Sequence, residues 1–127
     1  MSDREQAEEL LEIAERDLRA LRGMLDAPVF ADEVFGFLAQ QAIEESLKAW
    51  LCVLGRTYPL THDLTHLLSL LDDAGEDVLD LWDVAGFNPF AVGLRYSSLS
   101  ANDKPLDRGG AIARVEAVLK RAGDAIS

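Results

Sequence analysis

The sequence contains few of the residues that build disulfides, metal centres or membrane spans. Its 127 residues include one cysteine, Cys52, so no internal disulfide can form, and only two histidines. The longest uninterrupted apolar run, Ala49 to Leu54, is far shorter than the ~20 residues of a membrane-spanning helix. The N-terminal residues 1–5 are polar and acidic, unlike the basic and then apolar start of a secretory signal. We therefore expect a cytoplasmic protein that does not enter a membrane.

Basic residues are also scarce, and the formal net charge is −11. Such a charge argues against a general nucleic-acid coat protein, because phosphate binding draws on surplus Lys and Arg. The distribution is uneven: residues 1–94 hold 6 basic and 19 acidic residues, whereas residues 95–127 hold 6 basic and 4 acidic ones. The C-terminal third either contributes to an anion site or forms a basic last helix that packs near an acidic first one.

Apolar residues recur at spacings of three and four, and no segment alternates with the period of a strand. The pattern predicts one all-α domain over residues 1–127, an antiparallel up-and-down bundle of four to five helices. The expected helices span 2–24, 31–54, 61–75 and 76–82, a brief helix leading into 95–96, and 107–123.

Residue types at the expected helix ends predict where each helix begins and stops. Ser2, Thr61 and Asp107 are typical N-caps, because a short oxygen-bearing side chain can accept a backbone N–H of the first turn. Glycine suits the left-handed residue that follows many helices, so Gly55, Gly75 and Gly123 are the expected stops.

Three blocks of the sequence resemble the HEPN domain: residues 37–49 (FLAQQAIEESLKA), 58–64 (YPLTHDL) and 94–96 (LRY). The resemblance implies a helical bundle that usually dimerises, so we expect a homodimer or a higher even oligomer. It also implies a protein partner, because HEPN proteins are often encoded beside a minimal nucleotidyltransferase in two-component toxin–antitoxin modules. Some members of the wider superfamily bind nucleotides, and others are metal-independent ribonucleases that use an Arg-x4-6-His motif.

Arg56 and His62 are the catalytic candidates, because the five residues between them satisfy the spacing of that ribonuclease motif. His62 would act as general base or acid, and Arg56 would hold the scissile phosphate of an RNA. In ribonuclease members the Arg-His motif lies at the start of the last long helix, whereas here the two residues bridge the expected second and third helices. Alternatively, His62 orients the start of the third helix.

The ligand-binding candidates lie on the second helix and near residue 95. Lys48 and Arg95 offer positive charge to a phosphate, and Tyr96 offers a ring face to a base. The remaining candidates are Gln41, Glu44 and Asp63. Two structural alternatives stand beside this hypothesis: an ordinary i,i+4 ion pair between Glu44 and Lys48, and a latch from Arg95 to a carboxylate of the second helix.

Motifs for cofactors and metals are weak or missing. The sequence has no Gly-rich phosphate loop followed by Lys and no Gly-x-Gly-x-x-Gly fingerprint, so we expect no cofactor. His62 and His66 have the i,i+4 spacing of a shared metal ligand pair, but only a carboxylate such as Asp63 would complete a zinc site. We therefore expect an interaction or nucleotide-binding module without a metal, with a ribonuclease toxin as the alternative.

Overall fold

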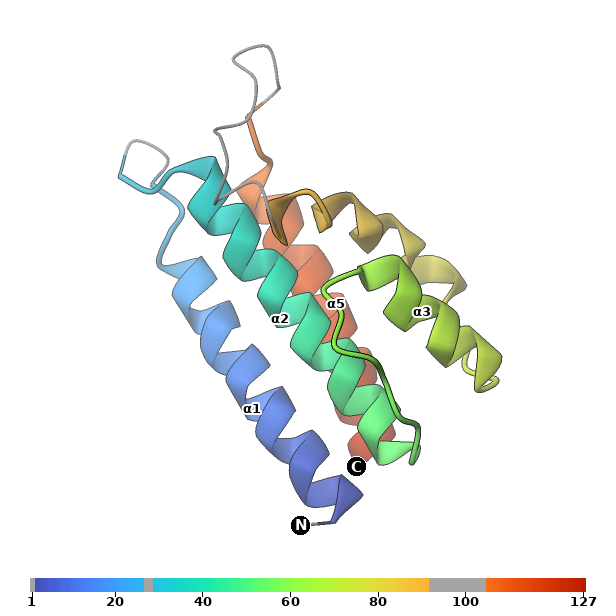
Figure 1. The fold of residues 1–127 in the computed structure, drawn as a ribbon. Coiled ribbons are helices and arrows are strands. Elements are labelled where there is room, and N and C mark those ends of the chain that lie inside the picture. Colours follow the sequence, from blue (N-terminus) through green and yellow to red (C-terminus); the bar gives the residue numbers. More distant parts are fainter. Residues whose placement is uncertain (1, 27–28, 92–104) are drawn as a thin grey trace.

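The computed structural model describes residues 2–26, 29–91 and 105–127, and the described residues are helical without a strand (Figure 1). The prediction of an all-α bundle is confirmed. The elements are α1 (Asp3–Arg22), α2 (Asp32–Val53), α3 (Leu64–Asp73), the 3-10 helix η1 (Leu79–Phe87) and α5 (Arg108–Ile126).

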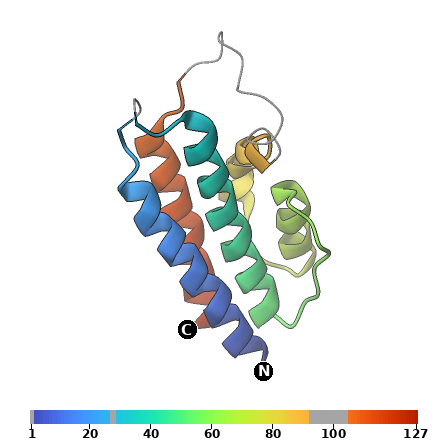
Figure 2. The same ribbon diagram turned by 60° about the vertical axis from the view of Figure 1, so that its left-hand side comes forward.

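Helices α1, α2 and α5 pack along one another, and α3 and η1 lie beside α2 (Figures 1 and 2). α1 runs antiparallel to α2 and α5, whereas α2 and α5 run in the same direction. Contacts at both ends agree with this arrangement. Arg108 at the start of α5 pairs with Asp32 at the start of α2, and Ile126 near the chain end packs in one cluster with Cys52.

Four of the predicted helix ends are confirmed. The Ser2 hydroxyl accepts a backbone N–H of the first turn of α1, and the Asp107 carboxylate does the same for α5. Gly55 and Gly75 follow α2 and α3 with φ angles of 73° and 89°. Glycine adopts this left-handed conformation without the steric cost that a Cβ would add.

The predicted start of α3 is wrong, because Asp63 and not Thr61 is its N-cap. The Asp63 carboxylate accepts the Thr65 N–H at 3.0 Å. The Thr61 hydroxyl instead accepts the N–H of Asp63 at 3.1 Å, outside the helix. Two oxygen-bearing side chains two residues apart both suit a cap, and the sequence alone does not separate them.

The predicted ends of the last two elements are also corrected. The element expected over 76–82 is the 3-10 helix η1, which starts later and continues through Gly86. α5 does not stop at Gly123 but runs to Ile126. Ile126 is buried in a cluster with Ala7 and Ala49, so the apolar surface it buries favours the extra turn over a glycine stop.

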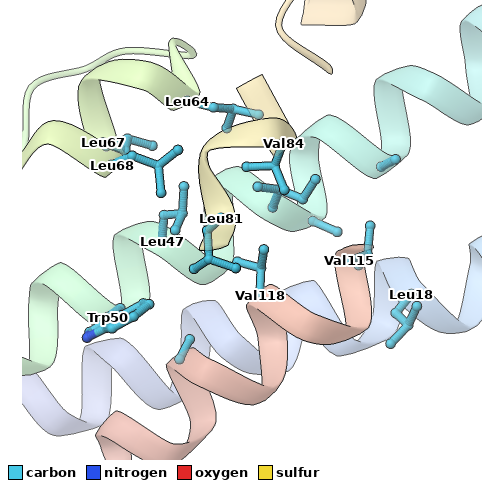
Figure 3. Packing of buried hydrophobic residues seen from close by; sticks show 14 of the residues in the cluster. Leu18, Leu47, Trp50, Leu64, Leu67, Leu68, Leu81, Val84, Val115 and Val118 are labelled. Atoms are coloured by element: carbon cyan, nitrogen blue, oxygen red, sulfur yellow. The ribbon is translucent and has the colours of Figure 1, made fainter. Parts of the chain in front are cut away.

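The core lies around α2, which packs against α1, α3, η1 and α5 (Figure 3). Each other element contributes buried aliphatic side chains to it. They are Leu18 from α1, Leu64, Leu67 and Leu68 from α3, Leu81 and Val84 from η1, and Val115 and Val118 from α5. α2 is therefore apolar around most of its circumference.

A buried arginine joins α5 to the connection between α1 and α2. Arg108 is only 7% exposed, and its guanidinium donates to the carbonyl oxygens of Met24, at 2.6 Å, and Phe30. It also pairs with Asp32 at 2.8 Å and lies 5.0 Å from the centre of the Phe35 ring. One side chain thus joins the start of α5 to the α1–α2 connection and the start of α2, which lie far from α5 in the sequence.

We expect Arg108→Ala to lower the free energy of unfolding by about 3 kcal/mol, because it removes the donor of the Met24 and Phe30 carbonyls and leaves the Asp32 carboxylate only its hydrogen bond from the Leu106 N–H. Urea denaturation followed by circular dichroism measures the change. Lys120→Ala is the matched control, since Lys120 pairs with Asp124 on the surface and its loss should cost less than about 0.5 kcal/mol. Equal effects of the two substitutions would contradict the role of Arg108.

Candidate functional site

A buried carboxylate organises the polar side of α2. Glu44 is 4% exposed and accepts hydrogen bonds on both oxygens. Gln40 Nε2 and His62 Nδ1 lie 3.0 and 2.9 Å from Oε1, and Lys48 Nζ lies 2.8 Å from Oε2. Gln40, Glu44 and Lys48 are four residues apart, so they follow one face of the helix. We call Gln40, Glu44, Lys48 and His62 the Glu44 cluster.

Two opposing effects set the charge of Glu44. Burial raises the pKa of the carboxyl, but the hydrogen bonds from Lys48, His62 and Gln40 outweigh burial and leave the pKa below its usual value. The carboxylate is therefore ionised at neutral pH. An ionised Glu44 requires its donors, so it fixes the orientation of both Lys48 and the His62 ring.

Gln40 is a member of the Glu44 cluster that the sequence analysis missed. It is fully buried, and its Nε2 donates both to Glu44 and, at 2.9 Å, to the backbone carbonyl of His62. Gln41, which was predicted, contributes indirectly by donating to Gln40 Oε1 at 3.2 Å. The sequence feature that could have identified Gln40 is its position four residues before Glu44, on the same face of the helix.

The members of the Glu44 cluster differ in their access to solvent. The His62 side chain is 68% exposed, whereas that of Lys48 is 13% exposed and its ammonium lies 5.6 Å from the centre of the Tyr58 ring. The part of the cluster that a ligand meets first is therefore the imidazole. Its Nδ1 is bound to Glu44, so Nε2 is the nitrogen that a ligand can contact.

Asp63 stabilises the start of α3 next to this site. Besides capping α3, its carboxylate accepts a hydrogen bond from Asn88 Nδ2 at 3.0 Å. Asn88 Oδ1 in turn accepts the Leu64 N–H at 2.8 Å, so the two side chains together bind the first turn of α3. Asn88 was not among the predicted residues, because nothing in the local sequence indicates that η1 returns to this helix.

Arg56 and His62 are not brought together. The Arg56 N–H donates to the Leu51 carbonyl near the end of α2, whereas the His62 carbonyl is bound by Gln40. The eleven residues from Gln40 to Leu51 correspond to about 16 Å along a helix. Arg56 lines a surface cavity of about 320 Å³ with Asp3, Gln6, Cys52, Gly55, Thr57 and Tyr58, and no member of the Glu44 cluster lines this cavity. Arg95 and Tyr96 lie outside the described residues.

Glu45, the neighbour of Glu44, is in a different environment. It faces Asp17 of α1, and no N–H of the described residues donates to its buried Oε2 atom. Burial, hydrogen bonding to Asp17 and the charges of Asp17 and Glu44 raise its pKa to about 9, against the opposing charge of Arg16. Glu45 is therefore protonated at neutral pH and shares its proton with Asp17.

A family model described as the HEPN domain matches residues 7–124, nearly the whole chain. No curated protein and no solved structure matches the chain. The matched region contains the complete Glu44 cluster. Within the described residues, no helix is long and apolar enough to span a membrane, and no three His, Cys, Asp or Glu side chains converge as metal ligands would.

We expect Glu45→Gln to stabilise the protein at neutral and alkaline pH. The pKa of about 9 in the folded state is above the ~4.3 of an unfolded Glu. The contribution of protonated Glu45 to the free energy of unfolding is therefore complete below pH ~4.3 and falls as the pH rises toward 9. Gln can still donate to Asp17 and has no proton to lose. Because Glu45 is only half-buried, we expect a gain of about 1 kcal/mol at pH 8.

Urea denaturation of both proteins at pH 5, 7 and 9 checks this prediction. The free energy of unfolding should fall less steeply with pH in Glu45→Gln than in the unsubstituted protein. Glu8→Gln is the control, because Glu8 lies in an exposed pair with Arg4 and should leave the pH dependence unchanged. Parallel pH profiles for all three proteins would show that Glu45 is ionised in the folded state.

Proposed function

Since the chain belongs to the HEPN family, we propose that it is an interaction and nucleotide-binding module. In this proposal the protein forms a homodimer or higher even oligomer and works beside a minimal nucleotidyltransferase in a two-component system of the toxin–antitoxin kind. The proposed binding site rests on the Glu44 cluster, in which the buried Glu44 carboxylate binds Lys48 of α2 and His62 of the connection to α3.

The chemistry of the cluster suits a nucleotide phosphate. The exposed His62 ring presents Nε2, and because Nδ1 donates its hydrogen to Glu44, Nε2 donates to a phosphate oxygen in the doubly protonated form of the ring. Lys48 adds positive charge behind it, although Glu44 balances part of that charge. The Tyr58 ring beside Lys48 is half-buried and provides an aromatic edge. Arg95 and Tyr96 remain further candidates for phosphate and base contacts.

The surface of the molecule supports association with other chains. Several large apolar side chains are exposed at the surface. Those exposed by half or more are Leu25, Val29, Leu60 and Leu79. Contact with a second copy or with a protein partner would remove this apolar area from water, which is the main favourable term in protein association.

We expect His62→Ala to weaken ATP binding about tenfold, because the substitution removes the one exposed imidazole that Glu44 orients. Isothermal titration of the purified protein with ATP measures the dissociation constant. His66→Ala is the matched control, since His66 is an exposed histidine of α3 outside the cluster. Equal affinities in all three proteins, or equal losses in both variants, would reject the site.

A ribonuclease is the second candidate function, and the pairing of Glu44 with His62 favours it. A carboxylate that orients an imidazole is the arrangement that general acid–base catalysis uses. Arg56, the proposed phosphate ligand, is bound about 16 Å further along α2, and a displacement of ~1 Å can already cost ~100-fold in rate.

We therefore expect little or no RNA cleavage by the purified protein. Gel electrophoresis of a structured RNA after incubation with the protein and EDTA measures cleavage without metal. Cleavage that is abolished in His62→Ala and retained in His66→Ala, with unchanged circular dichroism spectra, would make the ribonuclease the correct function. An Arg56→Ala variant then tests whether Arg56 takes part.

A further inference from the structure

His62 is held to α2 at two points, although its side chain is mostly exposed. The ring Nδ1 lies 2.9 Å from Glu44 Oε1, and the backbone carbonyl accepts a hydrogen bond from Gln40 Nε2 at 2.9 Å. Gln40 and Glu44 are both buried and lie about one turn apart on the same helix. The main chain and the ring of His62 are therefore both fixed relative to α2.

Glu44 determines which nitrogen of the His62 ring carries the hydrogen. An ionised carboxylate can only accept hydrogen bonds, so Nδ1 must donate its hydrogen to Glu44 Oε1. In the neutral ring Nε2 then has no hydrogen and carries a lone pair. No protein group in the described part of the chain hydrogen-bonds to Nε2. The nitrogen that remains for a reagent is thus the nucleophilic one.

Glu44 also stabilises the product of a reaction at Nε2. An electrophile that bonds to Nε2 leaves the ring positively charged, because Nδ1 keeps its hydrogen. The buried carboxylate already lies 2.9 Å from Nδ1, so it offsets this charge without moving. An imidazole that a carboxylate both orients and stabilises as a cation is the arrangement of activated histidines.

The charges around the ring favour an anionic electrophile over a neutral one. After the reaction the ring and Lys48 carry two positive charges, and Glu44, whose Oε2 lies 2.8 Å from Lys48 Nζ, carries one negative charge. The Asp63 carboxylate is bound to the Thr65 N–H and to Asn88 at the start of α3. A phosphoryl group adds the negative charge that the ring and Lys48 can balance, whereas a neutral acyl group adds none.

We propose that His62 is a phosphorylation site, whose Nε2 takes a phosphoryl group from an acyl phosphate or a phosphoramidate. The Nε2 lone pair forms the N–P bond while the P–O bond of the acyl phosphate, or the P–N bond of the phosphoramidate, breaks. The leaving group takes the bonding electron pair and departs as a carboxylate or as ammonia. This inference goes beyond the proposed function, because it requires neither a nucleotide nor a partner chain.

His66 provides an internal control in the same molecule. It is the second of the two histidines, and it is also exposed, on the first turns of α3. Within the described ranges no carboxylate binds its ring. The two imidazoles therefore differ in the contact with Glu44, which is the feature on which the proposal depends.

Incubation of the purified protein with potassium phosphoramidate at pH 8 tests the proposal. Peptide mass spectrometry without acid, because the N–P bond is acid-labile, measures the phosphorylation rate of each histidine. We expect His62 to react at least tenfold faster than His66 in the folded protein. In concentrated urea the two rates should become similar, because unfolding removes the contact between Glu44 and His62. Phosphorus NMR should assign the product to Nε2.

Two variants test the role of the carboxylate. Glu44→Gln should lower the rate at His62 at least fivefold and leave the rate at His66 unchanged, because Gln keeps the shape of Glu44 without its charge. Glu8→Gln, in an exposed pair with Arg4, should leave both rates unchanged. Circular dichroism checks that both variants are folded. If Glu44→Gln is unfolded, the rate ratio of the unsubstituted protein with and without urea decides the question.

Equal rates at the two histidines of the folded protein would overturn the proposal. So would a rate ratio that urea leaves unchanged, a product at Nδ1, or a folded Glu44→Gln variant that reacts as fast as the unsubstituted protein.

The ATP titration separates this inference from the proposed function. Selective phosphorylation of His62 without ATP binding would reject the nucleotide site and retain the phosphorylation site. ATP binding without selective phosphorylation would reject the phosphorylation site alone.

Discussion

The ionised Glu44 carboxylate in the middle of α2 is the constraint on which the site and much of the fold depend. An unpaired buried carboxylate costs several kcal/mol, so the helix can contain Glu44 only where donors surround it. Gln40 and Lys48 supply two donors from the same helix, and His62 supplies the third from the connection to α3. The polar stripe of an otherwise apolar helix is thus one connected unit.

The need for His62 at this level of α2 determines the path of the following chain. After α2 ends at Val53, residues 54–63 return along the helix until Gln40 binds the His62 carbonyl. α3 then begins directly after Asp63, and Asn88 from the end of η1 binds its first turn. Because this connection and η1 carry the chain back, α5 can run in the same direction as α2.

Local patterns in the sequence were sufficient for the helices but not for contacts between them. Spacing and cap residues predicted α1, α2 and the start of α5, because periodicity and capping act within a few residues. The end of α5 depends on burial of Ile126 against α1 and α2, which has no local signal. The same limit applies to the site: the motif spacing of Arg56 and His62 does not reveal that their backbones are bound at different levels of α2.

Glu44 and Glu45 are consecutive residues of α2 whose carboxyl pKa values shift in opposite directions. Consecutive residues point about 100° apart on a helix, so the two carboxyls meet different neighbours. Glu44 is surrounded by donors and stays ionised, whereas Glu45 meets the Asp17 carboxylate and stays protonated. The Glu44 side has a fixed arrangement of charge, and it is the side to which we assign the proposed nucleotide. The Glu45 side holds a proton at neutral pH, so it carries less negative charge than its two carboxyls would if both were ionised.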